Sequence, residues 1–442
     1  DADHAVLHLS ARRARVKGRA VVQYYHAHQV NPRKCRGHMN CMRRCPTQAI
    51  RVRNGTAVIH DELCIDCGTC ISVCPSAAID PVINPLQAFS GFKYKVVVPS
   101  SALYAQFDSS IHPWVIHQAF RRLGFDLVVN VGLTCEYLAK ATTRYLDKYT
   151  GPRPVISSEC PCVIRLIQVR YPDLVGNIIR LDVRRELTAR GTRRSLMAST
   201  GLGSEEIGII YISPCPAKVV SIEQPAEKEQ SWFNGAVAIR DVYALLYPIV
   251  MGLQAEFDEG AVPEDFFFRA GWPILGGITQ SLNMDNWLAV SGLDHVMKIF
   301  DDIENSRLRN VDYVEAVACM MGCVGGIFNV ENPYVARANN IRQRTRYEKG
   351  RPIPEAEIER RLTDGDFALE HSVPPRPTKY FDTDLETSIK RLREVDRIFQ
   401  KLHQIDCGVC GAPTCKAFAE DCARGDARLT DCVFLSNRGG AE

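Results

Sequence analysis

The chain has 442 residues, which is too many for one compact core, so two to four domains are expected. Its formal net charge of +3 is nearly neutral for this length and gives no electrostatic reason to expect a nucleic-acid partner. No stretch of the sequence reaches the roughly 18 consecutive apolar residues that a membrane-spanning helix needs.

The 18 cysteines lie mostly in short local runs, whereas the partners of disulfide bonds are usually scattered. Local runs of this kind chelate metals. The basic residues near the N-terminus are not followed by the apolar core of a signal peptide. These features predict a cytoplasmic, reducing location.

Residues 1–30 are predicted to form an N-terminal extension with a basic, strand-like pattern. Such a segment could cover the domain that follows it, or it could mediate homodimer formation. The sequence gives no basis for choosing between these two roles.

Residues 33–80 contain an internal repeat, in which KCRGHMNCMRRCPTQAI is echoed about 29 residues later by LCIDCGTCISVCPSAAI. In bacterial proteins with two 4Fe-4S clusters, the fourth cysteine of each such run crosses over to the other cluster. The first cluster is therefore assigned to Cys35, His38, Cys41 and Cys74, and the second to Cys64, Cys67, Cys70 and Cys45. A ferredoxin-like α+β domain is expected over residues 31–88.

The main alternative to iron-sulfur clusters is zinc, because cysteine and histidine also suit tetrahedral zinc. In both halves of the repeat, the ligand positions are separated by two, two and three residues and end in Cys-Pro. This repeated spacing favours 4Fe-4S clusters over zinc. His38 is either a ligand or a surface histidine beside a cluster with three protein ligands, and its register favours ligation. A neutral imidazole in place of a thiolate should raise the reduction potential of the first cluster and make it an electron sink.

Residues 89–372 have the texture of alternating strands and helices. The apolar segments that predict buried strands are Lys95–Pro99, Phe125–Val131, Pro154–Ser158, Ile207–Ser213 and Val314–Cys319. Such strands predict an α/β domain of parallel sheets flanked by helices, with ligands beyond the carboxyl ends of the strands. Three cysteines, Cys160, Cys215 and Cys319, stand at those ends.

Residues 373–402 are predicted to form a linker and one amphipathic helix. The stiff sequence VPPRP begins at Val373, and a capping box of Thr383 and Glu386 opens the helix. Residues 403–442 are then expected to be a small helical module for a third accessory 4Fe-4S cluster. Its proposed ligands are Cys407, Cys410, Cys415 and Cys432.

Three peptides of the central domain resemble the signature motifs of iron-iron hydrogenases, in the same order. They are ISSECPCVIRLIQVRYPDL, ISPCPAK and EAVACMMGCVGG. With the repeat and the C-terminal module included, essentially the whole chain resembles the sensory branch of that family. The resemblance implies an H-cluster, which is a 4Fe-4S cubane joined to a diiron dithiolate unit with carbonyl and cyanide ligands.

The resemblance also implies roles for individual residues. Cys160, Cys215, Cys319 and Cys323 would hold the cubane, and Cys323 would bridge to the diiron unit. Lys218 matches the lysine that pairs with a cyanide ligand. A scaffold without the diiron unit would have no anion there that needs a buried cation.

The chain departs from the prototypical catalytic members at several motif positions. Glu159 replaces a cysteine that passes protons, Ser213 replaces a methionine beside the diiron unit, and Met320 and Met321 stand where Pro and Gly are common. A carboxylate can relay protons, but with a different reach, so slow turnover is expected. The alternative for Glu159 is a solvated loop carboxylate.

Three of the 18 cysteines remain without an assigned cluster, namely Cys135, Cys162 and Cys422. Cys162 lies two residues from a proposed ligand and is the strongest candidate for a functional role among them. Cys422 is interpreted as a bystander.

The resemblance implies an anaerobe's hydrogen sensor or slow hydrogenase, whose substrates are hydrogen and protons. Its electrons would leave through the accessory clusters to a redox or signalling protein. One alternative is a fully catalytic hydrogenase subunit of a larger electron-transfer complex. The other is a non-catalytic iron-sulfur protein without the diiron unit, against which Lys218 and Cys323 argue.

Overall fold

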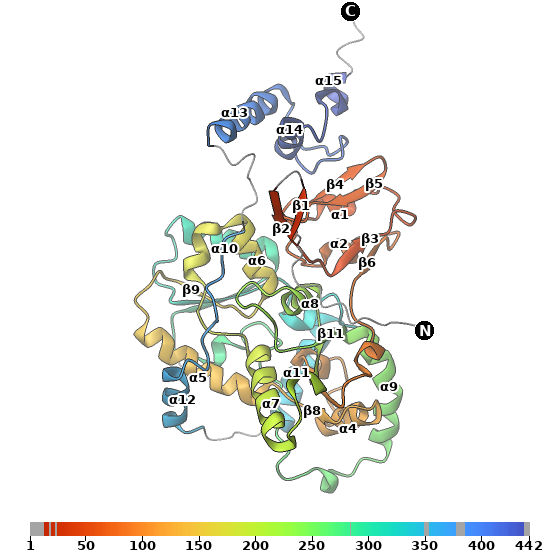
Figure 1. Cartoon of the computed structure of the whole chain (residues 1–442), viewed down its shortest axis with the longest axis vertical. Coiled ribbons are helices and arrows are strands. Elements are labelled where there is room, and N and C mark those ends of the chain that lie inside the picture. Colours follow the sequence, from red (N-terminus) through yellow and green to blue (C-terminus); the bar gives the residue numbers. More distant parts are fainter. Residues whose placement is uncertain are drawn as a thin grey trace, which may run out of the picture.

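The computed structural model describes residues 13–16, 19–22, 24–282, 284–348, 353–376 and 385–436. A large α/β body forms one end of the molecule, and the cysteine repeat lies between this body and the helical C-terminal module (Figure 1). Within the described ranges, no helix combines the length and the apolar character needed to cross a membrane.

The central body contains two parallel sheets. One has the order β11-β10-β7-β8 and the other has the order β12-β13-β9. The strands are β7 (Tyr94–Pro99), β8 (Leu127–Val128), β9 (Val155–Ile156), β10 (Ile207–Ser213), β11 (Gly235–Ala238), β12 (Trp287–Ser291) and β13 (Tyr313–Val317). The predicted class of parallel sheets flanked by helices is confirmed.

All five predicted strands are present, and β10 has the predicted limits. Strands β8 and β9 are only two residues long. The strands predicted at Phe125–Val131 and Pro154–Ser158 were therefore too long, because the sequence patterns used to predict them continue beyond the paired residues. The sequence did not predict β11 or β12. Small residues make up β11, and β12 is only partly buried, so neither has the continuous bulky apolar run of a central strand.

Helices cover the faces of both sheets (Figure 1). They are α3 (Ser101–Tyr104), α4 (Pro113–Arg122), α5 (Gly132–Lys148), α6 (Pro161–Arg170), α7 (Arg184–Thr200), α8 (Pro216–Glu223), α9 (Ile239–Ala255), α10 (Leu293–Glu304), α11 (Pro333–Tyr347) and α12 (Glu355–Thr363). Both α6 and α8 begin at a proline, whose fixed φ and missing N–H suit the first helical position. Cysteines Cys160 and Cys215 are the N-cap residues of these two helices, so the strand-to-helix turns present them at one edge of the sheets.

The repeat folds into two similar halves built from short antiparallel strands and one-turn helices. Its elements are β3 (His28–Val30), α1 (Asn40–Arg43), β4 (Ile50–Arg53), β5 (Thr56–Ile59), α2 (Thr69–Ser72) and β6 (Ile79–Pro81). Strand β3 pairs with β6, and β4 pairs with β5. Ile65, from the second half, joins an apolar cluster of the central body, so the second half packs directly on that body.

Two further segments complete the described chain. Strands β1 (Arg13–Val16) and β2 (Arg19–Val22) form an antiparallel hairpin within the N-terminal extension. The C-terminal module contains α13 (Leu385–Lys401), α14 (Cys415–Arg424) and α15 (Val433–Ser436). The capping box predicted at Thr383 lies outside the described residues.

Two residues of the predicted linker, within the described residues 373–376, pack against the rest of the molecule. Val373 and Arg376 are both buried. The Arg376 guanidinium donates hydrogen bonds to the carbonyl of Asp61 over 2.7 Å and to that of Cys64 over 3.1 Å. This segment therefore ties the central body to the second half of the repeat.

Candidate functional site

The central candidate site is a buried pocket at the carboxyl ends of three strands. Its lining includes Cys160, Cys215, Cys319 and Cys323. The first three of these cysteines follow β9, β10 and β13, respectively. The structure thus brings together the four side chains that the sequence predicted to hold one cubane, in the place that parallel sheets favour for ligands.

The loop between Cys319 and Cys323 depends on a glycine. Gly322 has φ +96°, and a Cβ atom there would lie 2.7 Å from the backbone nitrogen of Leu275 and from the carbonyl oxygen of Pro273. Only glycine fits this backbone without displacing its neighbours. The close approach fixes the turn that directs Cys323 into the pocket.

Lys218 is the one lysine that lines this pocket. It is 2% exposed, and its Nζ atom lies 3.2 Å from the Cys323 Sγ atom. Burial opposes the charged form, but the neighbouring Cys323 sulfur outweighs it and raises the pKa of Lys218 well above its usual value. The Cys323 sulfur thus favours the ammonium form of Lys218 in this pocket.

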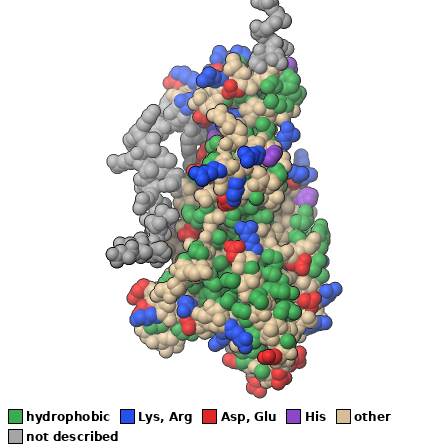
Figure 2. Space-filling model, turned by 90° about the vertical axis from the view of Figure 1, so that its right-hand side faces the viewer, with side chains coloured by type: hydrophobic (Ala, Val, Ile, Leu, Met, Phe, Trp, Pro, Cys, Tyr) green, Lys and Arg blue, Asp and Glu red, His purple; other side chains and the backbone are tan. Residues whose placement is uncertain are grey.

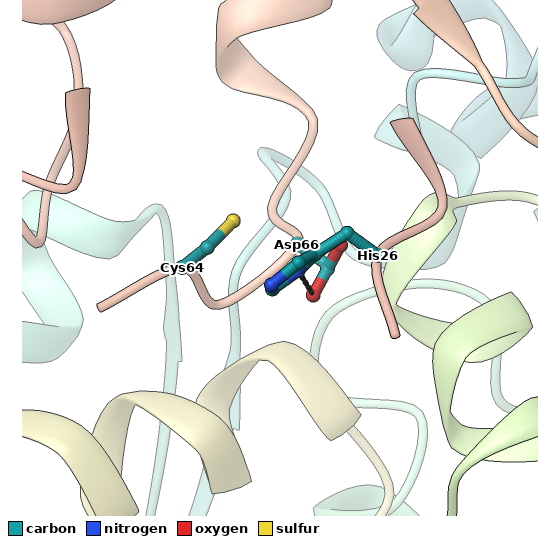
Figure 3. Close-up of side chains that lie close together, drawn as sticks. All are labelled: His26, Cys64 and Asp66. Carbon is teal, nitrogen blue, oxygen red and sulfur yellow. Dashed lines mark hydrogen bonds and ion pairs between the residues drawn. The ribbon is translucent and has the colours of Figure 1, made fainter. Parts of the chain in front are cut away.

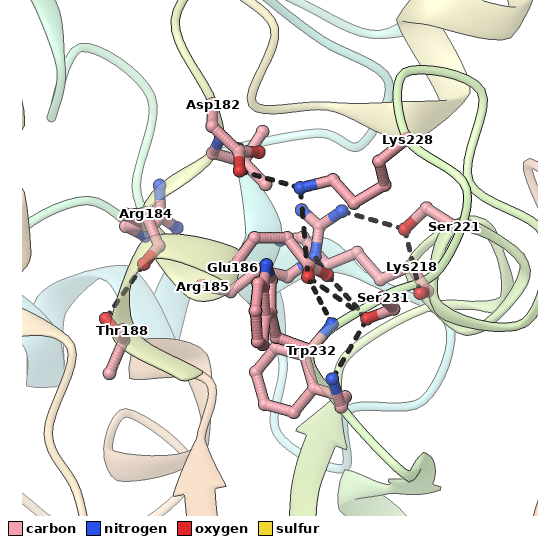
Figure 4. Close-up of polar contacts among 12 residues, drawn as sticks. Asp182, Arg184, Arg185, Glu186, Thr188, Lys218, Ser221, Lys228, Ser231 and Trp232 are labelled. Carbon is pink, nitrogen blue, oxygen red and sulfur yellow. Dashed lines mark hydrogen bonds and ion pairs between the residues drawn. The ribbon is translucent and has the colours of Figure 1, made fainter. Parts of the chain in front are cut away.

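A network of buried polar groups holds the helix that carries Lys218 (Figure 4). The Ser221 hydroxyl donates to the Lys218 carbonyl over 2.9 Å, and Arg185 Nη2 donates to Ser221 Oγ over 2.8 Å. Beside them, the Lys228 ammonium lies 2.6 Å from an Asp182 carboxylate oxygen. The bonds from Arg185 to Ser221 and from Ser221 to Lys218 tie α8 to α7 beside the pocket.

Glu159 is buried and paired, which excludes the alternative of a solvated loop carboxylate. Its Oε2 atom lies 2.7 Å from Arg184 Nη1, and its Oε1 atom accepts the backbone N–H of Arg184 over 2.8 Å. The Arg184 guanidinium also lies over the Trp272 ring, 5.4 Å from its centroid. Sequence reasoning missed Arg184, and the proton-relay role of Glu159 stays a prediction.

Ser213 and Cys162 lie close to the same turns. The Ser213 hydroxyl donates to the Cys215 carbonyl over 2.9 Å, so this side chain supports the turn after β10. Cys162 lines the pocket together with Cys67 of the repeat. Burial is the main cause that raises the pKa of the Cys162 thiol well above its usual value, and the charge of Cys67 is the next largest cause. Functional roles for both side chains stay predictions.

The chemistry of the central thiols fits a bound iron cluster. Burial raises the pKa of Cys160 and raises that of Cys215 to about 11. Metals bind the thiolate form, and a bound cation supplies the charge that buried thiolates need. Four convergent sulfur donors match the coordination of a 4Fe-4S cluster.

The first half of the repeat forms a second cysteine-lined pocket. Its lining includes the four side chains predicted for the first cluster, Cys35, His38, Cys41 and Cys74. Cys74 comes from the second half of the repeat, as the crossed ligand pattern requires. His38 is exposed at the surface of this half.

The ligands predicted for the second cluster lie near the central pocket. Burial is the main cause that raises the pKa of the Cys70 thiol, and nearby Cys67 and Cys45 raise it further. Burial is also the main cause that raises the pKa of the Cys64 thiol, and Cys67 and Cys70 lie among its neighbours. Cys67 and Cys70 thus lie near both Cys64 and Cys45, and Cys67 also lines the central pocket.

A buried carboxylate lies beside this second set of cysteines (Figure 3). Asp66 Oδ2 lies 3.0 Å from His26 Nδ1, and Asp66 Oδ1 lies 3.2 Å from His28 Nδ1. The other ring nitrogen of His28 lies 3.7 Å from Cys64 Sγ. Burial opposes ionisation, but the two histidines and Arg165 outweigh it and hold the pKa of Asp66 well below its usual range.

His26, Cys64 and Asp66 are close enough together to hold a metal ion by themselves. The spacing of the repeat assigns Cys64 to the second cluster, so we interpret the histidines and Asp66 as the hydrogen-bonding surroundings of that cluster. Sequence reasoning missed them. Asp66 lies within a cluster-binding loop. Nothing in the sequence indicates that His26, which precedes β3, and His28, within β3, would face it.

The C-terminal module contains a third cysteine-lined pocket. Its lining includes all four predicted ligands, Cys407, Cys410, Cys415 and Cys432. Cys422 lies on α14 and is not among the lining residues of this pocket. This placement agrees with the interpretation of Cys422 as a bystander.

Three family profiles match separate parts of the chain. The profile of the iron only hydrogenase large subunit, C-terminal domain, matches residues 93–246. A 4Fe-4S dicluster domain matches residues 27–75, and an Fe-S cluster family matches residues 402–434. The first match covers the N-terminal part of the central body and ends before Cys319 and Cys323, the second lies in the repeat and the third lies in the C-terminal module.

Two curated relatives are hydrogenases by name. The chain is 23% identical over 364 residues to the NADP-reducing hydrogenase subunit HndD of Solidesulfovibrio fructosivorans, covering 66% of this chain and 62% of that protein. It is 25% identical over 254 residues to iron hydrogenase 1 of Clostridium pasteurianum, covering 48% and 44%. The chain thus spans less than two thirds of the length of either relative.

Among solved structures, a variant of the FeFe-hydrogenase HydA1 from Chlamydomonas reinhardtii is similar to this chain. The two share 15% sequence identity with a TM-score of 0.47, and the match covers 67% of this chain and 98% of that protein.

Proposed function

We propose that this chain, which belongs to the iron-only hydrogenase family, reversibly splits hydrogen at an H-cluster and passes the electrons through accessory 4Fe-4S clusters. We further propose that turnover is slow and that the role is sensory or regulatory. A separate redox or signalling protein would receive the electrons.

The contact between Lys218 and Cys323 carries this proposal. An ammonium group that is almost fully buried has a large desolvation cost, which is offset only when an anion or a strong acceptor lies beside it. Lys218 lies 3.2 Å from the Cys323 sulfur and lines the same pocket. A diiron unit attached to Cys323 would give this ammonium a second anionic partner, the cyanide ligands, beside the sulfur.

The proposed roles follow from this placement. Cys160, Cys215, Cys319 and Cys323 would hold the cubane, and Cys323 would also hold the diiron unit. When bound, the diiron unit supplies the metal at which hydrogen is split into protons and electrons. Lys218 would orient the unit by attracting its anionic ligands.

The pairing of Glu159 supports slow turnover. A relay group must approach the donor of the proton and then release the proton onward. Both oxygens of Glu159 are engaged, one by the Arg184 guanidinium and one by the Arg184 backbone N–H. A proton taken up by Glu159 would remove the negative charge that pairs with the buried Arg184 guanidinium, and this cost would oppose each transfer.

Infrared spectra of the fully matured protein test the proposal. Absorption bands of carbonyl and cyanide ligands are expected, and they should be lost in Lys218→Met. Absence of the bands from mature protein that holds its full complement of iron would overturn the hydrogenase proposal. The spectra do not depend on the rate of turnover, so a slow sensor would still give the bands.

Hydrogen-uptake assays on Glu159→Ala test the relay separately. Lower uptake with unchanged infrared bands would support a role in moving protons. Unchanged uptake would remove that role and leave the Glu159 pair with Arg184 as a structural contact.

A second candidate is a fully catalytic subunit of a larger electron-transfer complex. The name of the relative from Solidesulfovibrio fructosivorans favours it, since that protein is described as a subunit. Rapid uptake by the purified chain with an artificial electron acceptor would favour this candidate over the sensory role.

A further inference from the structure

The C-terminal module is fixed to the repeat by a buried carboxylate. Asp421, on α14, accepts hydrogen bonds from Arg51 Nε over 2.6 Å and from Arg51 Nη2 over 3.1 Å. Arg53 Nη2 donates to the same carboxylate over 2.7 Å. The side chains of Arg51 and Asp421 are 3% and 1% exposed, so this bidentate pair is enclosed between the two units.

Backbone groups of the module's cluster loop are also held by the repeat. The Val52 N–H donates to the Gly411 carbonyl over 2.8 Å. Arg53 Nη1 donates to the Cys410 carbonyl over 2.6 Å, and Arg43 Nη2 donates to the Cys407 carbonyl over 3.0 Å. Two proposed cluster ligands of the module are therefore positioned by arginines of the repeat.

These contacts place the module beside the first cluster pocket of the repeat. Val52 lines that pocket, and its backbone N–H binds the carbonyl of the residue that follows Cys410. A single stretch of β4 backbone thus separates the two cysteine-lined pockets. On the other side of the module's loop, Ile405 and Val409 are 56% and 54% exposed.

We propose that the module carries the outermost cluster of a fixed chain of clusters, with the first cluster of the repeat as an internal relay. The order would be central pocket, second cluster, first cluster and C-terminal cluster. The direction of electron flow rests on the proposed function, whereas the docking of the module does not. Electrons would leave from the C-terminal cluster. Because His38 should raise the potential of the first cluster, that cluster would hold each electron until the C-terminal cluster or its partner accepts it.

The electron balance is simple. Splitting one hydrogen molecule gives two protons and two electrons at the central site. Each cubane carries one electron at a time, so the two electrons pass singly along the chain of clusters. A one-electron redox protein that contacts the module would accept them in two successive steps.

Two glycines of the module give a matched pair of variants. Gly411 has φ +77°, and a Cβ atom there would lie 1.9 Å from the Val52 carbonyl oxygen. Gly425 has φ +83°, and a Cβ atom there would meet nothing within 4 Å. Gly411→Ala and Gly425→Ala thus introduce the same backbone strain, but only the first pushes the module away from the repeat.

Electron paramagnetic resonance of the dithionite-reduced full-length protein tests the proposal. Chemical reduction loads the accessory clusters without hydrogen, so the result is independent of the diiron unit. Spectra with magnetic coupling between the C-terminal and first clusters are expected in the wild type and in Gly425→Ala. The coupling should be lost in Gly411→Ala and in Asp421→Asn, with iron content unchanged.

Two outcomes would overturn the proposal. One is a wild-type protein with its full iron content whose C-terminal cluster shows no coupling to another cluster. The other is coupling that persists unchanged in both Gly411→Ala and Asp421→Asn. Asp421→Asn lies outside the cysteine loop, so it separates loss of docking from loss of the cluster if Gly411→Ala binds less iron.

Discussion

The two halves of the repeat share one sequence pattern but lie in opposite surroundings. In the first half, Arg36 and His38 are exposed. In the second half, Cys64 and Ile65 are buried, and Asp66 is 1% exposed because the central body covers it. The pattern of cysteines defines the two cluster loops, whereas the neighbouring units decide how each loop is solvated.

The left-handed residue at the start of each one-turn helix shows the same difference. Met39 holds this position in the first half with φ 65°, and Gly68 holds it in the second half with φ 79°. A Cβ atom on Gly68 would lie 2.8 Å from Ile327 Cγ2 and 3.2 Å from Pro216 Cγ, both in the central body. Glycine is therefore needed where the second half meets its neighbour, while the first half tolerates a large side chain.

The largest effect is expected from Asp66→Asn, which would remove the buried charge of the second half. His26, His28 and Arg165 would lose their shared carboxylate in a site that excludes water. Breaking a buried ion pair from one side typically costs about 3–5 kcal/mol. Anaerobic denaturation of the loaded protein, followed by the visible absorbance of the clusters, measures this loss of stability.

Asp80→Asn provides the matched control in an exposed setting. Asp80 pairs with Lys34 over 3.1 Å, and both side chains are substantially exposed. Exposed pairs contribute little, so its denaturation midpoint should match that of the wild type. Equal losses in the two variants would contradict the expected contrast between a buried and an exposed carboxylate.

Gly68→Ala should weaken the contact between the second half and the central body. The strain of a left-handed alanine and the overpacking against Ile327 together predict a loss of about 2–4 kcal/mol. Met39→Ala, at the equivalent position, should cost less because an L-residue already occupies it. Hydrogen exchange of the loop around Ile327 measures the effect, and similar exchange in both variants would contradict it.

The sequence predicted the ligand sets better than it predicted their surroundings. Cysteine spacing is local, so the crossed placement of Cys74 followed from the repeat alone. The environments of Asp66, Glu159 and Asp421 depend on partners more than 20 residues away, which spacing does not encode. Strand length shows a similar limit. The length of β10, whose apolar run is buried throughout, was predicted correctly, whereas β8 and β9 are shorter than their apolar runs.

His38→Cys should make the first cluster resemble the second in its ligands. A thiolate adds negative charge to the cluster, so its reduction potential should fall, on the order of 100 mV. Redox titration followed by electron paramagnetic resonance measures this shift. The second cluster serves as the internal control, and an unchanged potential of the first cluster would show that His38 is not a ligand.

The smallest effect is expected from Cys162→Ala, at the contact between the second half and the central pocket. Cys162 and the proposed ligand Cys160 line the same pocket, as does Cys67 of the second cluster. Cys160 is the N-cap of α6, whereas Cys162 lies within its first turn and is 3% exposed. If Cys162 only fills space, the variant should lose about 1 kcal/mol of stability and keep its iron. Loss of one cluster's iron would instead make Cys162 a ligand and would reassign the donors on this side of the pocket.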